Sequence, residues 1–93
     1  MSRRFSLKLQ AEQGKLHDFS ATIAGRLVLS GDALQARSYS TADLPDDPVE
    51  VRVITTGVVG AQYTITVAFG GKEEGFVWRY TLSAPLQSVA FHV

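Results

Sequence analysis

Apolar and polar residues alternate along most of this chain, and no segment keeps the 3.6-residue period of a surface helix. Alternation with a period of two places every second side chain on the same face of a β-strand. Glycine, proline and aspartate interrupt the pattern, as turns require. The pattern predicts about seven strands, which are centred on residues 5–11, 19–29, 34–39, 49–53, 63–69, 76–82 and 89–93.

Short strands without any helical segment favour an antiparallel β-sandwich, formed by a single domain over residues 1–93. A small β-barrel would produce the same alternation and stays open as an alternative. The chain has 93 residues, of which 45% are hydrophobic and 19% are charged. That composition is typical of a globular domain with one modest core and excludes a disordered chain.

The apolar pattern also predicts how strands pair, if consecutive strands are neighbours in a sheet. The first two runs would then form a hairpin around Gly14 to Leu16. The turn Gly31-Asp32 would join the second run to the third.

Aromatic residues stand at alternate positions in the sixth run, at Phe76, Trp78 and Tyr80. A hairpin with the preceding run would place Phe76 opposite Phe69, Trp78 opposite Val67 and Tyr80 opposite Ile65. We therefore expect a row of aromatic rings to fill the core, with Trp78 buried.

Charge is balanced overall but unevenly distributed. Nine basic and nine acidic residues give a formal net charge of zero, which argues against a nucleic-acid partner. Residues 1–42 hold six basic and three acidic residues, whereas residues 43–93 hold three basic and six acidic residues. Opposite halves of this kind suit either internal neutralisation or association between molecules.

The expected register places Arg4, Arg26 and Arg37 in one row, on the sheet face that points away from the core. Like charges side by side destabilise a sheet. The row is therefore either neutralised by acidic residues of the second half or used to bind a carboxylate, a phosphate or an acidic protein surface. In this register Tyr39 would lie next to the row, and Lys8 would lie beyond it. The candidate binding residues are Arg4, Lys8, Arg26, Arg37 and Tyr39.

Two further segments are candidates for contact with a partner. Val58 and Val59 stand between glycines at an expected loop tip, where their side chains would be exposed. The same segment also fits a loop folded over the open end of the sandwich or a strand continued with a bulge at Gly57. The last run carries Val89, Phe91 and Val93 with no charged residue apart from His92. Such a strand is either an inner strand or an edge paired with another subunit, and edge pairing of identical chains would give a two-fold homodimer.

The sequence contains no motif for nucleotide binding, hydrolysis or zinc binding. Cysteine is absent, and the two histidines lack neighbours that would complete a metal site. We therefore expect no catalytic residue, no metal and no cofactor. The leading interpretation is a non-enzymatic protein-interaction module that self-associates and binds an acidic or anionic partner surface.

The alternative function is a small lectin-like module that binds a sugar or another small ligand, with Tyr39 as its aromatic platform. No apolar run is long enough to span a membrane, and no signal-peptide pattern is present. Together with the absence of cysteine, this predicts a cytoplasmic protein.

Overall fold

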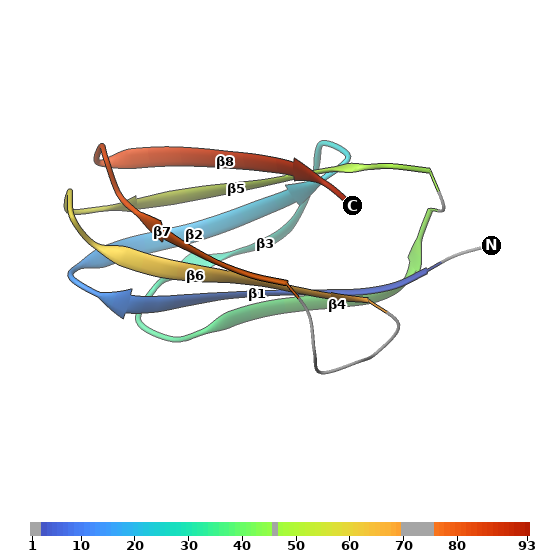
Figure 1. Cartoon of the computed structure of the whole chain (residues 1–93), viewed down its shortest axis with the longest axis horizontal. Helices are drawn as coiled ribbons and strands as arrows, with labels where there is room; N and C mark the ends of the chain where they lie inside the picture. The colour runs from blue at the N-terminus through green and yellow to red at the C-terminus, as the bar shows by residue number, and fades with distance from the viewer. Residues whose placement is uncertain (1–2, 46, 70–75) are drawn as a thin grey trace.

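A computed structural model of the chain describes residues 3–45, 47–69 and 76–93, and this part of the chain forms eight β-strands (Figure 1). None of the described segments is a helix that could cross a membrane. The strands are β1 (Arg3–Gln13), β2 (Leu16–Ile23), β3 (Arg26–Asp32), β4 (Arg37–Leu44), β5 (Glu50–Gly57), β6 (Gln62–Phe69), β7 (Phe76–Thr81) and β8 (Leu86–His92).

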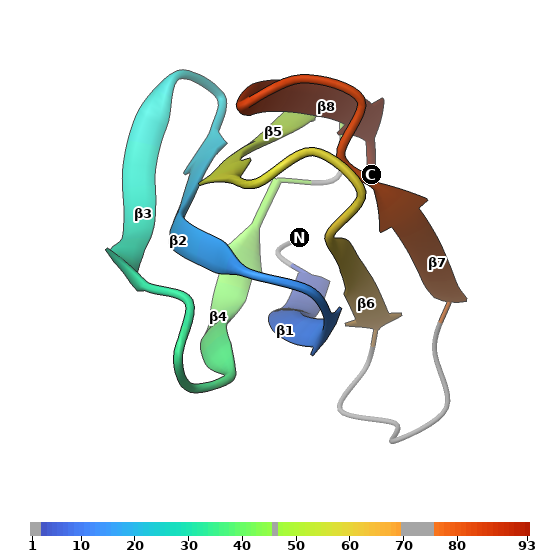
Figure 2. The same cartoon turned by 90° about the vertical axis from the view of Figure 1, so that its left-hand side faces the viewer.

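The eight strands form two antiparallel four-stranded sheets that pack face to face (Figures 1 and 2). Sheet A has the order β4-β1-β6-β7, and sheet B has the order β3-β2-β5-β8. Neither sheet closes on itself, so the predicted β-sandwich is confirmed and the barrel alternative is wrong. β4, β7, β3 and β8 are edge strands.

The predicted strand over residues 19–29 is two strands, because the chain turns at Ala24-Gly25. Both residues have positive φ angles, 52° and 80°, as a tight hairpin turn of the twisted type requires. The turn pairs Ile23 of β2 with Arg26 of β3. Alternation alone did not reveal this turn. Ile23 before the turn and Leu27 after it both stand at odd-numbered positions, so the apolar pattern continues across it.

The first two expected hairpins are wrong. β1 and β2 lie in different sheets, and β1 pairs with β4 and β6 instead. Gly31 and Asp32 lie within β3, and the chain crosses to the other sheet before Arg37. The physical reason is that two strands with one apolar face each bury those faces equally well when they face one another across the core.

The third expected hairpin forms, with its register shifted by two residues. Val67 pairs with Phe76, Ile65 with Trp78, and Tyr63 with Tyr80. A shift of two keeps every side chain on its expected face. The loop that joins these strands lies outside the described residues.

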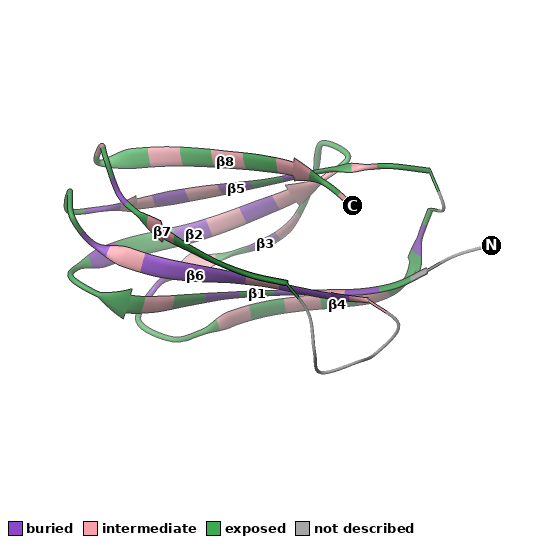
Figure 3. Ribbon diagram, in the orientation of Figure 1, coloured by how far each residue is buried: buried purple, intermediate pink, exposed green. Residues whose placement is uncertain are grey.

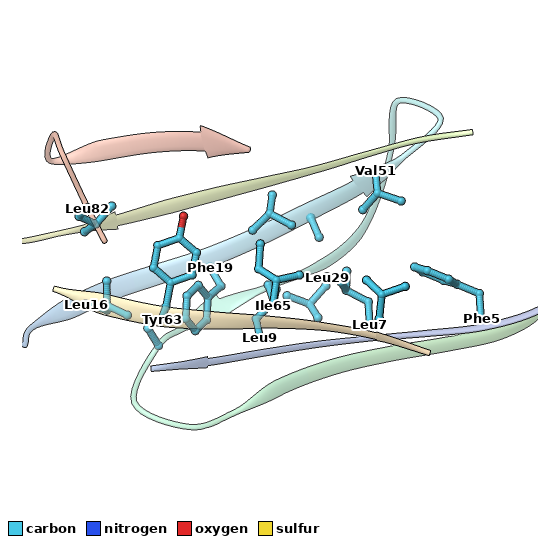
Figure 4. Close-up of a cluster of buried hydrophobic side chains, with 14 of the residues drawn as sticks. Phe5, Leu7, Leu9, Leu16, Phe19, Leu29, Val51, Tyr63, Ile65 and Leu82 are labelled. Atoms are coloured by element: carbon cyan, nitrogen blue, oxygen red, sulfur yellow. The ribbon is translucent and has the colours of Figure 1, made fainter. Parts of the chain in front are cut away.

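The core lies between the sheets and draws on both of them (Figure 3). Figure 4 shows its side chains, in which the Tyr63 ring rises from β6 toward sheet B and lies near Phe19. The centres of these two rings are 6.0 Å apart. The most completely buried hydrophobic side chains are Phe5, Leu7, Leu9, Phe19, Val51, Val53, Tyr63, Ile65, Val67 and Leu82.

The two halves of the chain repeat one topology, although their sequences show no evident repeat. Replacing each strand by its counterpart in the other half, four places later for β1 and β4 and four places earlier for β6 and β7, converts the order of sheet A into that of sheet B. The same hydrogen bond recurs at one end of each half. Ala33 N–H donates to the carbonyl of His17, and Leu82 N–H donates to the carbonyl of Ala61.

These paired hydrogen bonds set the correspondence between the halves. Phe19 then corresponds to Tyr63, so the contact between their rings lies at the approximate two-fold axis. The inner strands β1, β6, β2 and β5 carry most of the buried core, and each inner pair joins one half to the other. The open sides of the sandwich, β3 with β4 and β7 with β8, are therefore equivalent places (Figure 2).

Candidate functional site

The expected row of three arginines does not form, because its strands are not neighbours. Arg4 lies on β1 in sheet A, whereas Arg26 begins β3 in sheet B. Arg37 lies on β4 opposite the buried Leu9, so it projects toward the core side of sheet A. The register that would have aligned them required hairpins that are absent.

Arg37 is neutralised within the chain. Its Nη2 lies 2.8 Å from Oδ2 of Asp32, and its Nε donates to the backbone carbonyl of Asp32 at 2.9 Å. The hydrogen bond from Arg37 and a second one from the Leu34 N–H hold the pKa of Asp32 below its usual value. Arg37 thus links the end of β3 to the start of β4.

Arg4 and Lys8 lie together on the outer face of sheet A, as the alternation predicts. Both are exposed, and Lys8 pairs across the strands with Ser38 of β4 and Thr66 of β6. Arg79 of β7 lies opposite Thr64 on the same face. The acidic side chain among the described residues of this face is Glu12, whose carboxylate accepts a hydrogen bond from the Thr64 hydroxyl.

A shallow hollow of about 350 Å³ lies beside Arg4 on this face. Its walls include the hydroxyl-bearing Ser6 and Ser40, which are direct cross-strand partners, and the methyl group of Ala42. No acidic residue is among the described residues that line it. A guanidinium beside two serine hydroxyls is a set of donors suited to a carboxylate or a phosphate.

A second hollow of about 400 Å³ opens between the edge strands β3 and β4, and it brings together two predicted residues, Arg26 and Tyr39. Tyr39 is half-buried and pairs with Leu7, so its ring projects from the core side of β4. This hollow, called the β3–β4 groove below, is lined by Ile23, Ala24, Arg26, Val28, Tyr39, Thr41, Asp43, Leu44 and Pro45.

The opposite open side exposes aromatic rings that were expected to be buried. Phe76 is 62% exposed and Trp78 is 37% exposed, because β7 is an edge strand with no neighbour on one side. Trp78 packs against Phe91 of β8, with ring centres 5.3 Å apart, and against Phe76 at 6.0 Å. Alternation shows which face of a strand is apolar, but it does not show whether the strand lies at the edge of a sheet. The exposure of these rings could therefore not be predicted from the sequence.

The predicted interface residues occupy two places. Val89 and Phe91 lie half-buried on the inner side of β8, which is an edge strand of sheet B. Val93 follows β8 and exchanges two backbone hydrogen bonds with Val49. Val58 and Val59 are 51% and 56% exposed after the end of β5, as expected for a loop tip.

Groups with acid–base or metal-binding chemistry are dispersed. His17 and His92 are both exposed and lie on β2 and β8. Within the described ranges, no group of three histidine or acidic side chains is placed to hold a metal ion.

Two hollows with charged residues in their walls are therefore the candidate sites: the one beside Arg4 on the outer face of sheet A and the β3–β4 groove.

Comparison of the chain with protein-family models, with curated proteins and with solved structures gave no match.

Proposed function

We propose that this protein is a non-enzymatic protein-interaction module that binds an acidic segment of a partner on the outer face of sheet A. The observation that carries the proposal is the hollow beside Arg4, which serine hydroxyls line and no described acidic residue neutralises. Arg4 forms no ion pair within the described part of the chain, in contrast to Arg37 and Arg52. A guanidinium that no described carboxylate engages suits a carboxylate from outside.

The surface around this hollow is flat enough for an extended partner segment. Serine, threonine and alanine occupy most outward positions of β4, β1 and β6, so Arg4 and Lys8 stand above their neighbours. Such side chains let a partner backbone approach the sheet closely. Lys8 supplies a second positive charge along the same strand, which adds attraction to a segment with several carboxylates.

A direct test measures binding of a fluorescently labelled glutamate-rich peptide by anisotropy at low ionic strength. The double variant Arg4→Glu with Lys8→Glu should weaken binding at least about tenfold, because each exchange turns attraction into repulsion. Arg52→Gln is the matched control, since Arg52 lies on sheet B and pairs with Glu50. Equal binding by the folded double variant and the parent would reject this face as the binding surface.

The proposal includes self-association along β8. This edge strand carries no charged residue apart from His92, so two copies related by a two-fold axis would meet without repulsion between like charges. Antiparallel pairing of two β8 strands would join both B sheets into one. The exposed rings of Phe76 and Trp78, at the same side of the sandwich, would then be covered by the second copy.

Light scattering at low and high salt tests the dimer against the 10.1 kDa mass of one chain. Ala90→Lys puts a charge on the exposed face of β8 and should return the protein to monomer at either salt concentration. Ala42→Lys, at another exposed alanine on the edge strand β4, should leave the dimer intact. A parent protein that is monomeric at all concentrations would remove self-association from the proposal. We assign this module to the cytoplasm, in keeping with its lack of cysteine.

A further inference from the structure

The approximate two-fold symmetry allows the two open sides of the sandwich to be compared residue by residue. Leu7 of the first half corresponds to Val51 of the second. Leu7 pairs with Tyr39 and Val51 pairs with Phe91, so Tyr39 corresponds to Phe91. By the same comparison, Arg26 and Leu29 of β3 correspond to Phe76 and Trp78 of β7. These are positions that project between the sheets at each open side.

The two sides fill this space differently. In the second half, the Trp78 ring packs against two other aromatic rings. Its centre lies 6.0 Å from that of Phe76 and 5.3 Å from that of Phe91. In the first half, a smaller leucine stands in the central position and an arginine replaces the outer ring. The β3–β4 groove of about 400 Å³ is lined by Arg26 and Tyr39 of this set. The groove therefore occupies the place where the other half stacks aromatic rings.

The groove combines aliphatic side chains with two charged ones that form no ion pair among the described residues. Ile23, Val28 and Leu44 supply aliphatic walls around the Tyr39 ring. Arg26 and Asp43 are both exposed, and neither forms an ion pair with a described residue. The volume lies at the lower end of the range for small-molecule sites, which are mostly apolar with a few placed polar groups.

We propose that the β3–β4 groove binds a saccharide, with one sugar ring packed on Tyr39. A pyranose has a face of C–H groups that packs on an aromatic ring and a rim of hydroxyls that both donate and accept hydrogen bonds. The carboxylate of Asp43 accepts from such hydroxyls, and the guanidinium of Arg26 donates to them. The charges of these two residues cancel, so the groove offers a neutral polyol two polar contacts without attracting anions in general.

This site is separate from the surface used in the proposed function. The sugar contacts lie between the sheets, whereas Arg4 and Lys8 lie on the outer face of sheet A. Thr41 lines both hollows, and its hydroxyl accepts a hydrogen bond from the Asp43 N–H. Substitutions at Arg26, Asp43 or Arg4 therefore distinguish one site from the other, and Thr41 is left unchanged in the tests.

The test is a titration of the ¹⁵N-labelled chain, followed by amide chemical shifts, with glucose, galactose, mannose, fucose, N-acetylglucosamine and cellobiose. Each sugar is added to about 100 mM, which detects dissociation constants in the millimolar range. At least one sugar should shift amides of residues 23–28 and 39–44 selectively. Asp43→Asn and Arg26→Gln should each weaken that binding about fivefold or more, and Tyr39→Leu should abolish it.

Arg4→Gln is the matched control and should bind the sugar as the parent does. Because Arg26 and Asp43 are exposed, their variants stay informative even if Tyr39→Leu fails to fold. The proposal is overturned if no sugar shifts these amides, or if the shifts persist unchanged in Asp43→Asn and Arg26→Gln. Glycine and phenylalanine serve as zwitterionic probes, and selective binding of either one without any sugar would also overturn it.

Discussion

The guanidinium of Arg37 occupies the space that a side chain on Gly31 would need. A β-carbon built on Gly31 would lie 2.9 Å from Cζ of Arg37, which is closer than real contacts of this kind. At the equivalent position of the second half stands Tyr80, whose ring stacks on Tyr63 at 5.6 Å between centres. The missing side chain at Gly31 is thus what lets Arg37 reach Asp32.

The first prediction concerns the pKa of Asp32 in Gly31→Ala. The added methyl group displaces the flexible end of Arg37, so the pKa of Asp32 should rise toward the usual aspartate value of about 3.9. Side-chain carboxyl shifts followed by NMR during an acid titration measure it directly. An unchanged pKa in this variant would show that Arg37 keeps its contact despite the methyl group.

The same ion pair sets the sign of a pH effect. The pKa of Asp32 is lower in the folded protein, so its contribution to stability is complete above the unfolded-state value and is lost as pH falls through the folded-state value. Arg37→Gln should remove this part of the acid dependence. Urea unfolding below and above pH 4, compared with the parent, measures the difference.

The second prediction compares Gly14 with Gly25, two glycines with positive φ angles of 78° and 80°. A β-carbon at Gly14 would lie 2.7 Å from the Cα of Ala61, whereas one at Gly25 would meet no atom within 4 Å. Gly25→Ala should therefore cost about 1 kcal/mol from backbone strain alone. Gly14→Ala should cost about 3 kcal/mol, because overpacking against backbone adds to that strain. Equal losses in urea unfolding would contradict this account.

The third prediction is a stabilising substitution at Thr55. This side chain is fully buried between the sheets, and its hydroxyl faces the phenol of Tyr63 without reaching hydrogen-bond geometry with any described residue. Valine has the same shape without the hydroxyl, so Thr55→Val should raise the free energy of unfolding by about 1 kcal/mol. Thr56→Val is the control, since the Thr56 hydroxyl accepts a hydrogen bond from the Asp18 N–H and its loss should not stabilise. A destabilised Thr55→Val would indicate that its hydroxyl has a partner in solution.

The fourth prediction uses Trp78, the one tryptophan of the chain. Its ring is partly exposed in the single chain, so acrylamide should quench its fluorescence readily at low protein concentration. If two copies pair along β8, quenching should fall and emission should shift to the blue as concentration rises. Ala90→Lys should abolish this concentration dependence without changing the low-concentration value. A spectrum independent of concentration in the parent would count against pairing at this side.

Alternation in the sequence was sufficient to predict which face of most strands is buried. Leu7, Leu9, Val51, Val53 and Ile65 all lie in the core, as their positions predict. The reason is that period two is a property of the single strand, whatever lies beside it. The sandwich and its buried stripes therefore follow from the sequence.

Neighbour relations could not be predicted in the same way. A strand with one apolar face shows the same sequence pattern whether its neighbour lies beside it or across the core. The pattern therefore pairs β1 with β2 wrongly. The expected arginine row fails for that reason, because Arg26 and Arg37 belong to different sheets, whereas Trp78 is exposed because its strand lies at the edge of sheet A. The β3–β4 groove depends on residues that only the crossing of the chain between sheets brings together.

The interleaving of the two halves has a consequence for how the chain acquires its structure. In each sheet the central pair joins a strand of the first half to one of the second, β1 with β6 and β2 with β5. A fragment that ends at Leu44 would have no neighbour for one side of either inner strand, and we expect it to remain unfolded. Because its central contacts join residues far apart in sequence, the chain should fold in milliseconds to seconds, as two-state proteins rich in nonlocal pairing do. During synthesis, stable structure should wait until β6 has left the ribosome.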